Sequence, residues 1–115
     1  MTVTSNDDIL ILSWKSNTSK LTDESFKTEA LKFADIVQQV NNKKIIVDMR
    51  KFRFNLSPAL VEWRNKNIIS VYNKIGAEKF AFISEKVTVP QNDLNNTFVT
   101  KYFSSEQAAV DWCLL

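Results

Sequence analysis

The sequence predicts an α/β domain in which a four- to five-stranded, mostly parallel sheet is flanked by three main helices. Three short apolar runs, at residues 9–14, 44–49 and 79–84, are nearly continuous, as is typical of strands covered on both faces. Segments with helical periodicity alternate with these runs, which favours parallel strands joined by right-handed crossovers. The 115 residues fit one domain, spanning residues 1–115, with a single core.

The segment between the first two runs predicts a helix over residues 23–40. Thr22 is the expected N-cap, and Asp23 and Glu24 place negative charge in the first turn, where the helix dipole favours it. Apolar residues recur at spacings of three and four and form one stripe, made of Phe26, Ala30, Phe33, Ala34, Val37 and Val40.

A second helix is expected to begin in the stretch "LSPALVEW", with Ser57 as N-cap and Pro58 at the first helical position. Gly76 is expected to end it, because glycine takes the left-handed conformation at low cost. Its apolar stripe continues through Ile68, Tyr72 and Ile75.

Two further strands are expected at the margins of the sheet. Residues 97–103 alternate between two faces, one of which holds Lys101, so they predict an edge strand. Residues 2–4 precede a turn-like "SNDD" and are expected to add a short antiparallel strand through a hairpin.

The third main helix is expected to open with a capping box at residues 104–107, "SSEQ", and to run to Trp112. Residues 85–96 lack a clear period and contain a proline and an Asn/Asp cluster, which predicts a loop. This loop has room for a short strand at residues 87–89.

The composition argues against most enzymes. The chain contains no histidine, which removes the usual general base, a common zinc ligand and every Ser–His or Cys–His pair. Gly76 is the only glycine, so the Gly-rich loops that bind phosphates are excluded. We therefore expect no enzymatic activity, no metal and no cofactor.

Several features favour a cytoplasmic protein. Residues 1–8 lack the charged and apolar regions of a secretory signal, and no apolar stretch approaches the roughly 20 residues of a membrane-spanning helix. Cys113 is the single cysteine, so an internal disulfide is impossible, and we expect its thiol to be a small buried hydrophobe. The expected state is a monomer or a homodimer.

Positive charge gathers between residues 43 and 74, where eight Lys or Arg residues stand against two acids. The loop after Asp48 follows the carboxyl end of a strand, where ligands of open α/β sheets usually bind. Arg50, Arg53 and the backbone N–H groups near Ser57 are therefore a candidate anion site. The alternative is a solvated basic face with a charged turn.

Two residues of this loop have competing interpretations. Asp48 is a candidate catalytic acid or phosphoacceptor, and the alternative is an aspartate that caps the turn or pairs with Arg50 or Arg53. Ser57 is a candidate phosphorylation site, because a helix N-terminus and nearby arginines favour added negative charge. The alternative role of Ser57 is that of an N-cap alone.

Trp63 lies at the margin of the stripe of the second helix, next to Arg64. It is a candidate for a partner interface as well as for a packing residue. Binding of nucleic acid is not expected, because the calculated pI of about 8.7 is below the usual range and no recognised motif accompanies the basic stretch.

Three stretches resemble a known family, namely "IIVDMRKFRFNLSPALVEW", "IGAEKFAFI" and "YFSSEQAAVDWCLL". They are similar to small bacterial STAS/SEC14-type domains, which are related to the anti-sigma-factor antagonists of sporulation. The likeness spans roughly residues 9–115. It implies a single STAS-like domain with a four- or five-stranded sheet flanked by helices, usually without enzymatic activity.

The resemblance also implies candidate roles. In the phosphorylated antagonists the regulatory serine begins the helix after the strand equivalent to residues 44–49, and Ser57 occupies the matching place. Its neighbours, "NLSPA", differ from the antagonist pattern of an acidic residue, two small hydroxyl residues and glycine. The SEC14 side of the family implies binding of a lipid or another apolar ligand.

The preferred hypothesis from the sequence is a non-enzymatic module that docks an unidentified partner protein through the basic surface around the second helix. The alternative hypothesis is a carrier or sensor of a small anionic or lipid-like ligand bound near the strand ends. The candidate binding residues are Asp48, Arg50, Arg53, Ser57, Trp63 and Arg64.

Overall fold

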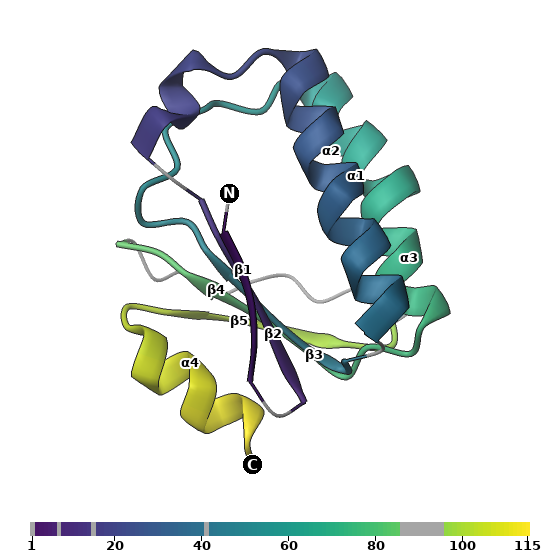
Figure 1. Ribbon diagram of the computed structural model, residues 1–115, viewed down its shortest axis with the longest axis vertical. Helices are drawn as coiled ribbons and strands as arrows, with labels where there is room; N and C mark the ends of the chain where they lie inside the picture. Colours follow the sequence, from purple (N-terminus) through teal and green to yellow (C-terminus); the bar gives the residue numbers. More distant parts are fainter. Residues whose placement is uncertain (1, 7, 15, 41, 86–95) are drawn as a thin grey trace.

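The computed structural model describes residues 2–6, 8–14, 16–40, 42–85 and 96–115. It contains one five-stranded mixed sheet in the order β1-β2-β3-β4-β5 (Figure 1). The α/β class that the sequence predicts is confirmed. The strands are β1 (Thr2–Asn6), β2 (Ile9–Ser13), β3 (Lys44–Asp48), β4 (Lys79–Ile83) and β5 (Val99–Phe103).

The strand pairing makes the sheet mixed, with one antiparallel and three parallel pairs. β1 pairs antiparallel with β2, whereas the pairs β2–β3, β3–β4 and β4–β5 are parallel. The predicted N-terminal hairpin strand is confirmed, and β5 lies at the edge of the sheet as expected. Because β2 to β5 run in the same direction, their carboxyl ends meet at the same edge of the sheet.

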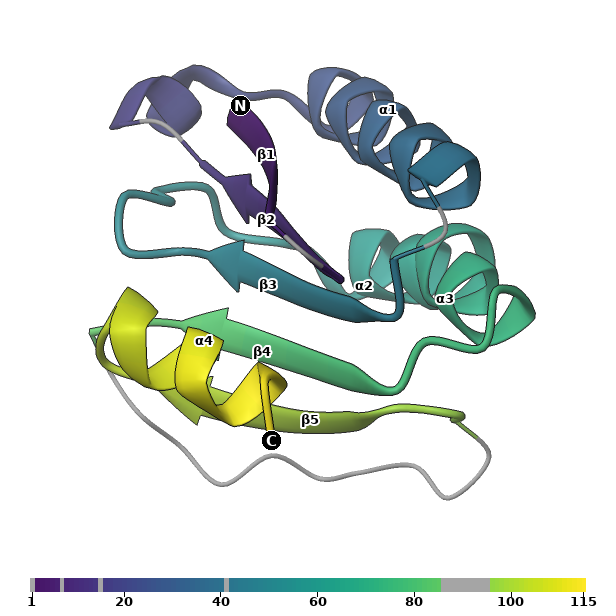
Figure 2. The same ribbon diagram turned by 60° about the horizontal axis from the view of Figure 1, so that its bottom comes forward.

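Helices cover both faces of the sheet. α1 (Asp23–Val40) and the helix formed without a break by α2 (Pro58–Arg64), η2 (Asn65–Ile69) and α3 (Ser70–Lys74) lie on one face (Figures 1 and 2). α4 (Glu106–Cys113) lies on the other face. A short 3-10 helix, η1 (Ser16–Lys20), precedes α1.

The predicted ends of the first two helices are confirmed. The Ser25 N–H donates to Thr22 Oγ1 at 3.2 Å, and the Thr22 N–H donates to Ser25 Oγ at 2.8 Å. The Leu60 N–H donates to Ser57 Oγ at 3.2 Å. Gly76 has a φ of 72°, as a left-handed C-terminal glycine requires.

Two local predictions are wrong. The N-cap of α4 is Ser105, whose Oγ accepts from the Ala108 N–H at 3.2 Å, and not Ser104. Ser105 is the residue with extended backbone before the helix, so its side chain can reach that N–H. Val40 was expected to belong to the buried apolar stripe of α1, but it is 42% exposed, because it is the last residue of the helix.

The second helix is also not uniformly α-helical, since η2 is wound as a π-helix. The Asn67 side chain donates to the Trp63 carbonyl oxygen at 2.9 Å, and Ser70 Oγ donates to the Lys66 carbonyl oxygen at 2.6 Å. Side chains that bond to carbonyls four residues back compete with the backbone N–H groups for those acceptors. The regular period of the sequence does not reveal this change.

The sheet separates two apolar clusters. Successive side chains of a strand point to opposite faces, so Leu10 and Leu12 pack toward α1 and α3, whereas Ile9 and Ile11 pack toward α4. The cluster under α4 is the smaller one, and Ala109 contributes to it.

Two segments close the carboxyl edge of the sheet, η1 and the loop of residues 49–57. Thr18 is buried between them, where its Oγ1 donates to the Lys51 carbonyl oxygen at 3.2 Å and accepts from the Arg53 N–H at 2.8 Å. The ring of Phe52 lies 5.0 Å from that of Trp14. These contacts hold the loop over the face that carries α1.

No helix among the described residues is long and apolar enough to cross a membrane. The short strand considered at residues 87–89 lies outside the described residues.

Candidate functional site

Three of the candidate residues come together in an open hollow at the carboxyl ends of β2 and β3. Asp48 ends β3, and Arg50 and Arg53 follow it in the loop. We call this the strand-end hollow, and its lining consists of Thr2, Ser13, Trp14, Asp48, Arg50, Lys51, Arg53 and Glu85.

Asp48 and Arg50 form a bidentate ion pair. Arg50 Nη2 donates to Asp48 Oδ2 at 2.7 Å and Arg50 Nε donates to Asp48 Oδ1 at 3.0 Å. The Arg50 backbone N–H also donates to Oδ1, at 3.1 Å. These hydrogen bonds from Arg50 hold the pKa of Asp48 below its usual value, against the opposing effect of burial. Asp48 therefore caps the turn and pairs with Arg50, which was one of its two interpretations.

Arg53 is bound to the loop itself. Its Nη1 donates to the carbonyl oxygens of Arg50 at 2.8 Å and Phe52 at 3.1 Å, and its Nη2 lies 4.0 Å from a Glu85 carboxylate oxygen. An anion in the strand-end hollow has to compete with these internal acceptors and with the Asp48 carboxylate. The hollow is therefore a weaker anion site than its count of basic residues indicates.

Replacing Arg50 with glutamine is expected to destabilise the fold by about 1 kcal/mol at pH 7, because the hydrogen bonds to the Asp48 carboxylate are lost and the 42% exposed Arg50 side chain is screened by water. The pKa of Asp48 is lowered in the folded state, so this stabilisation is present above the unfolded value of 3.8 and is lost as the pH falls through the folded pKa. Urea denaturation at pH 7, 5 and 3 measures the difference. The Lys66→Gln variant is the control, because Lys66 forms an exposed pair with Glu62. A difference that stays constant down to pH 3 would contradict this role of Asp48.

Ser57 and Trp63 lie away from the strand-end hollow, on α2. Ser57 is exposed and its Oγ accepts from the Leu60 N–H, so its role as N-cap is confirmed. Trp63 is partly buried, and Lys27 Nζ lies 5.5 Å from the centre of its ring. Neither residue lines the hollow that holds Asp48.

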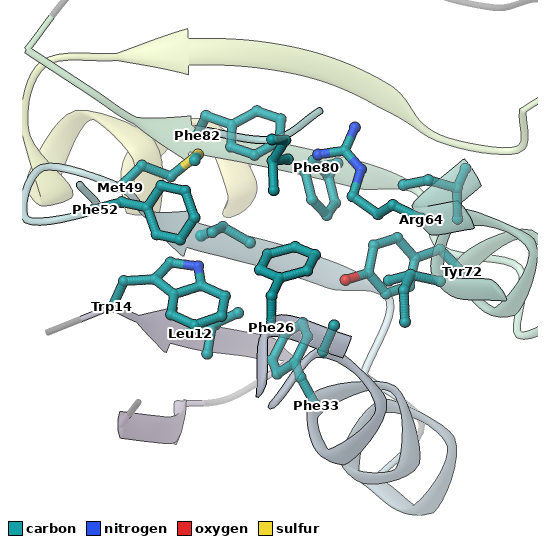
Figure 3. A pocket seen from close by; sticks show the side chains of 15 residues that line it. Leu12, Trp14, Phe26, Phe33, Met49, Phe52, Arg64, Tyr72, Phe80 and Phe82 are labelled. Carbon is teal, nitrogen blue, oxygen red and sulfur yellow. The ribbon is translucent and has the colours of Figure 1, made fainter. Parts of the chain in front are cut away.

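Arg64 belongs to a different site, an apolar cavity of about 60 Å³ between the sheet and the helices on the α1 face. Figure 3 shows this cavity with Trp14, Phe26, Phe52 and Phe82 around it. Its lining consists of Leu12, Trp14, Phe26, Ala30, Phe33, Val47, Met49, Phe52, Leu56, Arg64, Ile68, Ile69, Tyr72, Phe80 and Phe82.

One buried hydrogen-bond donor in this apolar lining has no acceptor among the described residues. Arg64 Nε is buried and unpaired. The Tyr72 hydroxyl and the Trp14 indole nitrogen turn toward the interior of the cavity in Figure 3. Burial raises the pKa of Tyr72 well above its usual value, although the Arg64 charge acts in the opposite direction. The Tyr72 hydroxyl is therefore protonated at neutral pH and able to donate.

Arg64 also lines a second, more polar groove of about 500 Å³ on the same face of the sheet. Asn65, Ser70 and Asn73 line this groove from the helix, and Thr100 lines it from β5. Arg64 thus stands between an apolar space and a polar one. It is the last residue of α2, immediately before the π-wound segment η2, and π-helical turns occur frequently at functional sites.

Sequence reasoning selected Arg64 as a partner contact and did not assign Tyr72, Met49 or Phe52 to a site. Tyr72 was expected only as part of an apolar stripe, and its burial is confirmed. The two phenylalanines of the loop, Phe52 and Phe54, are a signal for a covered apolar space, because a solvated connection has no need of them.

Comparisons with protein-family models, curated proteins and solved structures found no match. The resemblance to STAS/SEC14-type domains stays an expectation from the sequence. Docking of a partner protein through Arg50, Arg53, Ser57, Trp63 and Arg64 also stays a prediction.

Proposed function

We propose that this protein is a non-enzymatic carrier or sensor that binds a compact ligand in the apolar cavity, within a STAS-like domain. The observation that carries the proposal is the buried Arg64 Nε, which has no hydrogen-bond partner among the described residues, in an otherwise apolar lining. Pockets with a mostly apolar lining and few polar groups are typical of small-molecule sites.

The energetics favour a ligand over a structural role for the unpaired Arg64 Nε. A buried donor without an acceptor costs about 1–3 kcal/mol, and more when it is charged. A ligand with an acceptor group removes this cost and fills the space. A cavity of about 60 Å³ has room for only a few water-sized groups, each of which needs about 10–15 Å³, so the bound portion of the ligand is small.

Catalysis has little support in the same lining. Arg64 and Tyr72 are the titratable residues among those that line the cavity. Arginine stays charged and the buried Tyr72 hydroxyl stays protonated, so neither serves as a general base at neutral pH.

The first test uses hexan-1-ol as an uncharged probe of the cavity and the melting temperature of the purified chain as readout. We expect hexan-1-ol to raise the melting temperature, and at tenfold excess over its Kd the added stability is about 1.4 kcal/mol. The Ala30→Leu variant fills space that Ala30 lines and is expected to lose this response.

The matched control is Ala59→Leu, the same change at an exposed position of α2, which is expected to respond as the unmodified chain does. A melting temperature that falls equally in all three proteins would mean that the alcohol acts only as a denaturing solvent, and the proposal would then fail. Native mass spectrometry of the chain purified without denaturants supplies a second readout, since a retained ligand adds its mass.

A further inference from the structure

Arg64 has no carboxylate beside it among the described residues, whereas two nearby cations, Arg50 and Lys66, each form an ion pair. Arg50 pairs with Asp48. On the helix that carries Arg64, the exposed Lys66 pairs with Glu62 at 3.6 Å. Arg64 makes no ion pair with a described residue, and its Nε is enclosed without an acceptor. The planar guanidinium matches the two oxygens of a carboxylate, with which it forms paired hydrogen bonds.

The surroundings of Arg64 limit the charge of its ligand to one. Arg64 is the sole cation among the described residues that line the apolar cavity or the adjoining polar groove. A second negative charge would have no counter-charge beside it and would be costly to desolvate. The protonated hydroxyl of Tyr72 is a neutral donor in the same lining.

The size of the cavity limits the apolar part of the ligand. A water-sized sphere needs about 10–15 Å³ on this scale, so a cavity of about 60 Å³ holds roughly four to six such groups. Each buried methylene contributes about 0.8 kcal/mol to binding. An alkyl chain of roughly this number of carbons fills the space, whereas a long acyl chain exceeds it.

We infer that the ligand of the apolar cavity is a short-chain monocarboxylic acid, whose carboxylate pairs with Arg64 while its alkyl chain occupies the cavity. This inference rests on the proposed function and adds the chemical class of the ligand to it. The polar groove beyond Arg64 is the solvent-facing side from which the carboxylate is reached.

The test is a titration with sodium hexanoate, followed by the indole N–H signals of a ¹⁵N-labelled chain in NMR. The Trp14 signal is expected to move, because Trp14 lines the cavity, whereas the Trp112 signal stays, because Trp112 packs on the opposite face of the sheet. Arg64→Gln is expected to weaken hexanoate binding at least tenfold. Lys66→Gln is the control and is expected to bind hexanoate unchanged, since Lys66 is exposed on the same helix and lines neither the cavity nor the polar groove.

Hexan-1-ol separates failure of the inference from failure of the proposed function. If both probes move the Trp14 signal and Arg64→Gln binds hexanoate as tightly as the unmodified chain, the cavity binds ligands but Arg64 does not select a carboxylate. If neither probe moves the Trp14 signal, both proposals fall. If Arg64→Gln loses the dispersed Trp112 signal that marks a folded chain, the variant Arg64→Lys is used in its place. The inference is overturned if the unmodified chain binds hexanoate no more tightly than it binds hexan-1-ol.

Discussion

Replacing Phe33 with alanine is expected to lower the free energy of unfolding by about 3–5 kcal/mol. Phe33 is 1% exposed on the inner face of α1, and its ring meets that of Tyr72 edge-on with centroids 6.4 Å apart. Its removal takes apolar contacts from both helices that cover this face and leaves a cavity that the sheet cannot collapse to fill. Since small domains are stable by only about 5–15 kcal/mol in total, the variant is expected to be marginally folded.

Leu31→Ala is the control for this prediction. Leu31 lies on the same helix two residues earlier and is 45% exposed, so its truncation is expected to change stability by less than about 0.5 kcal/mol. Urea denaturation followed by far-UV circular dichroism measures both variants. Equal midpoints for Phe33→Ala and Leu31→Ala would show that α1 is not held to the sheet through Phe33.

Replacing Ala109 with glutamate is expected to cost about 3–5 kcal/mol, the range found when a buried charge has no partner. Ala109 is fully buried in the small cluster between α4 and the sheet, where Ile46, Ala81 and Ile83 surround the helix. A carboxylate there has either to lose its charge or to push α4 away from the sheet. The apolar faces of β3 and β4 would then be open to water.

The neighbouring change Ala108→Glu supplies a matched comparison, because Ala108 is exposed on the same helix. It is expected to leave stability nearly unchanged. Denaturant midpoints and binding of an apolar fluorescent dye measure the two variants side by side. If Ala109→Glu is as stable as Ala108→Glu and binds no more dye, α4 does not seal that face of the sheet.

The two faces of the sheet thus differ in how they are packed. The smaller cluster under α4 is a sealed packing layer, whereas the larger cluster under α1 and α2 encloses the apolar cavity with Arg64 at its margin. A ligand in the cavity touches side chains from both helices on that face and from the loop of residues 49–57. Ligand binding is therefore expected to stabilise the α1 face rather than the α4 face.

The sequence by itself determined the helices and strands, because their signals are local. The bounds of α1, the caps at Thr22 and Ser57 and the end of the second helix at Gly76 follow from side chains within a few residues of each end. The apolar runs of β2, β3 and β4 follow from burial on both faces. Errors in the ends of these elements amount to one or two residues, as at the N-cap Ser105 and at the start of β5. The 3-10 helix η1 and the π-wound segment η2 were not predicted.

Only the tertiary structure decided where the charged residues act. Asp48, Arg50 and Arg64 all belong to one basic stretch of the sequence. The first two neutralise each other at the strand ends, whereas Arg64 lines the cavity and its Nε has no partner among the described residues. The residue type alone gives the charge of a side chain. Whether that charge has a counter-charge or a hydrogen-bond acceptor depends on which distant groups the packing of the helices and the sheet brings close to it. The same holds for the cavity itself, since Trp14, Phe52 and Tyr72 enclose it from three separate segments of the chain.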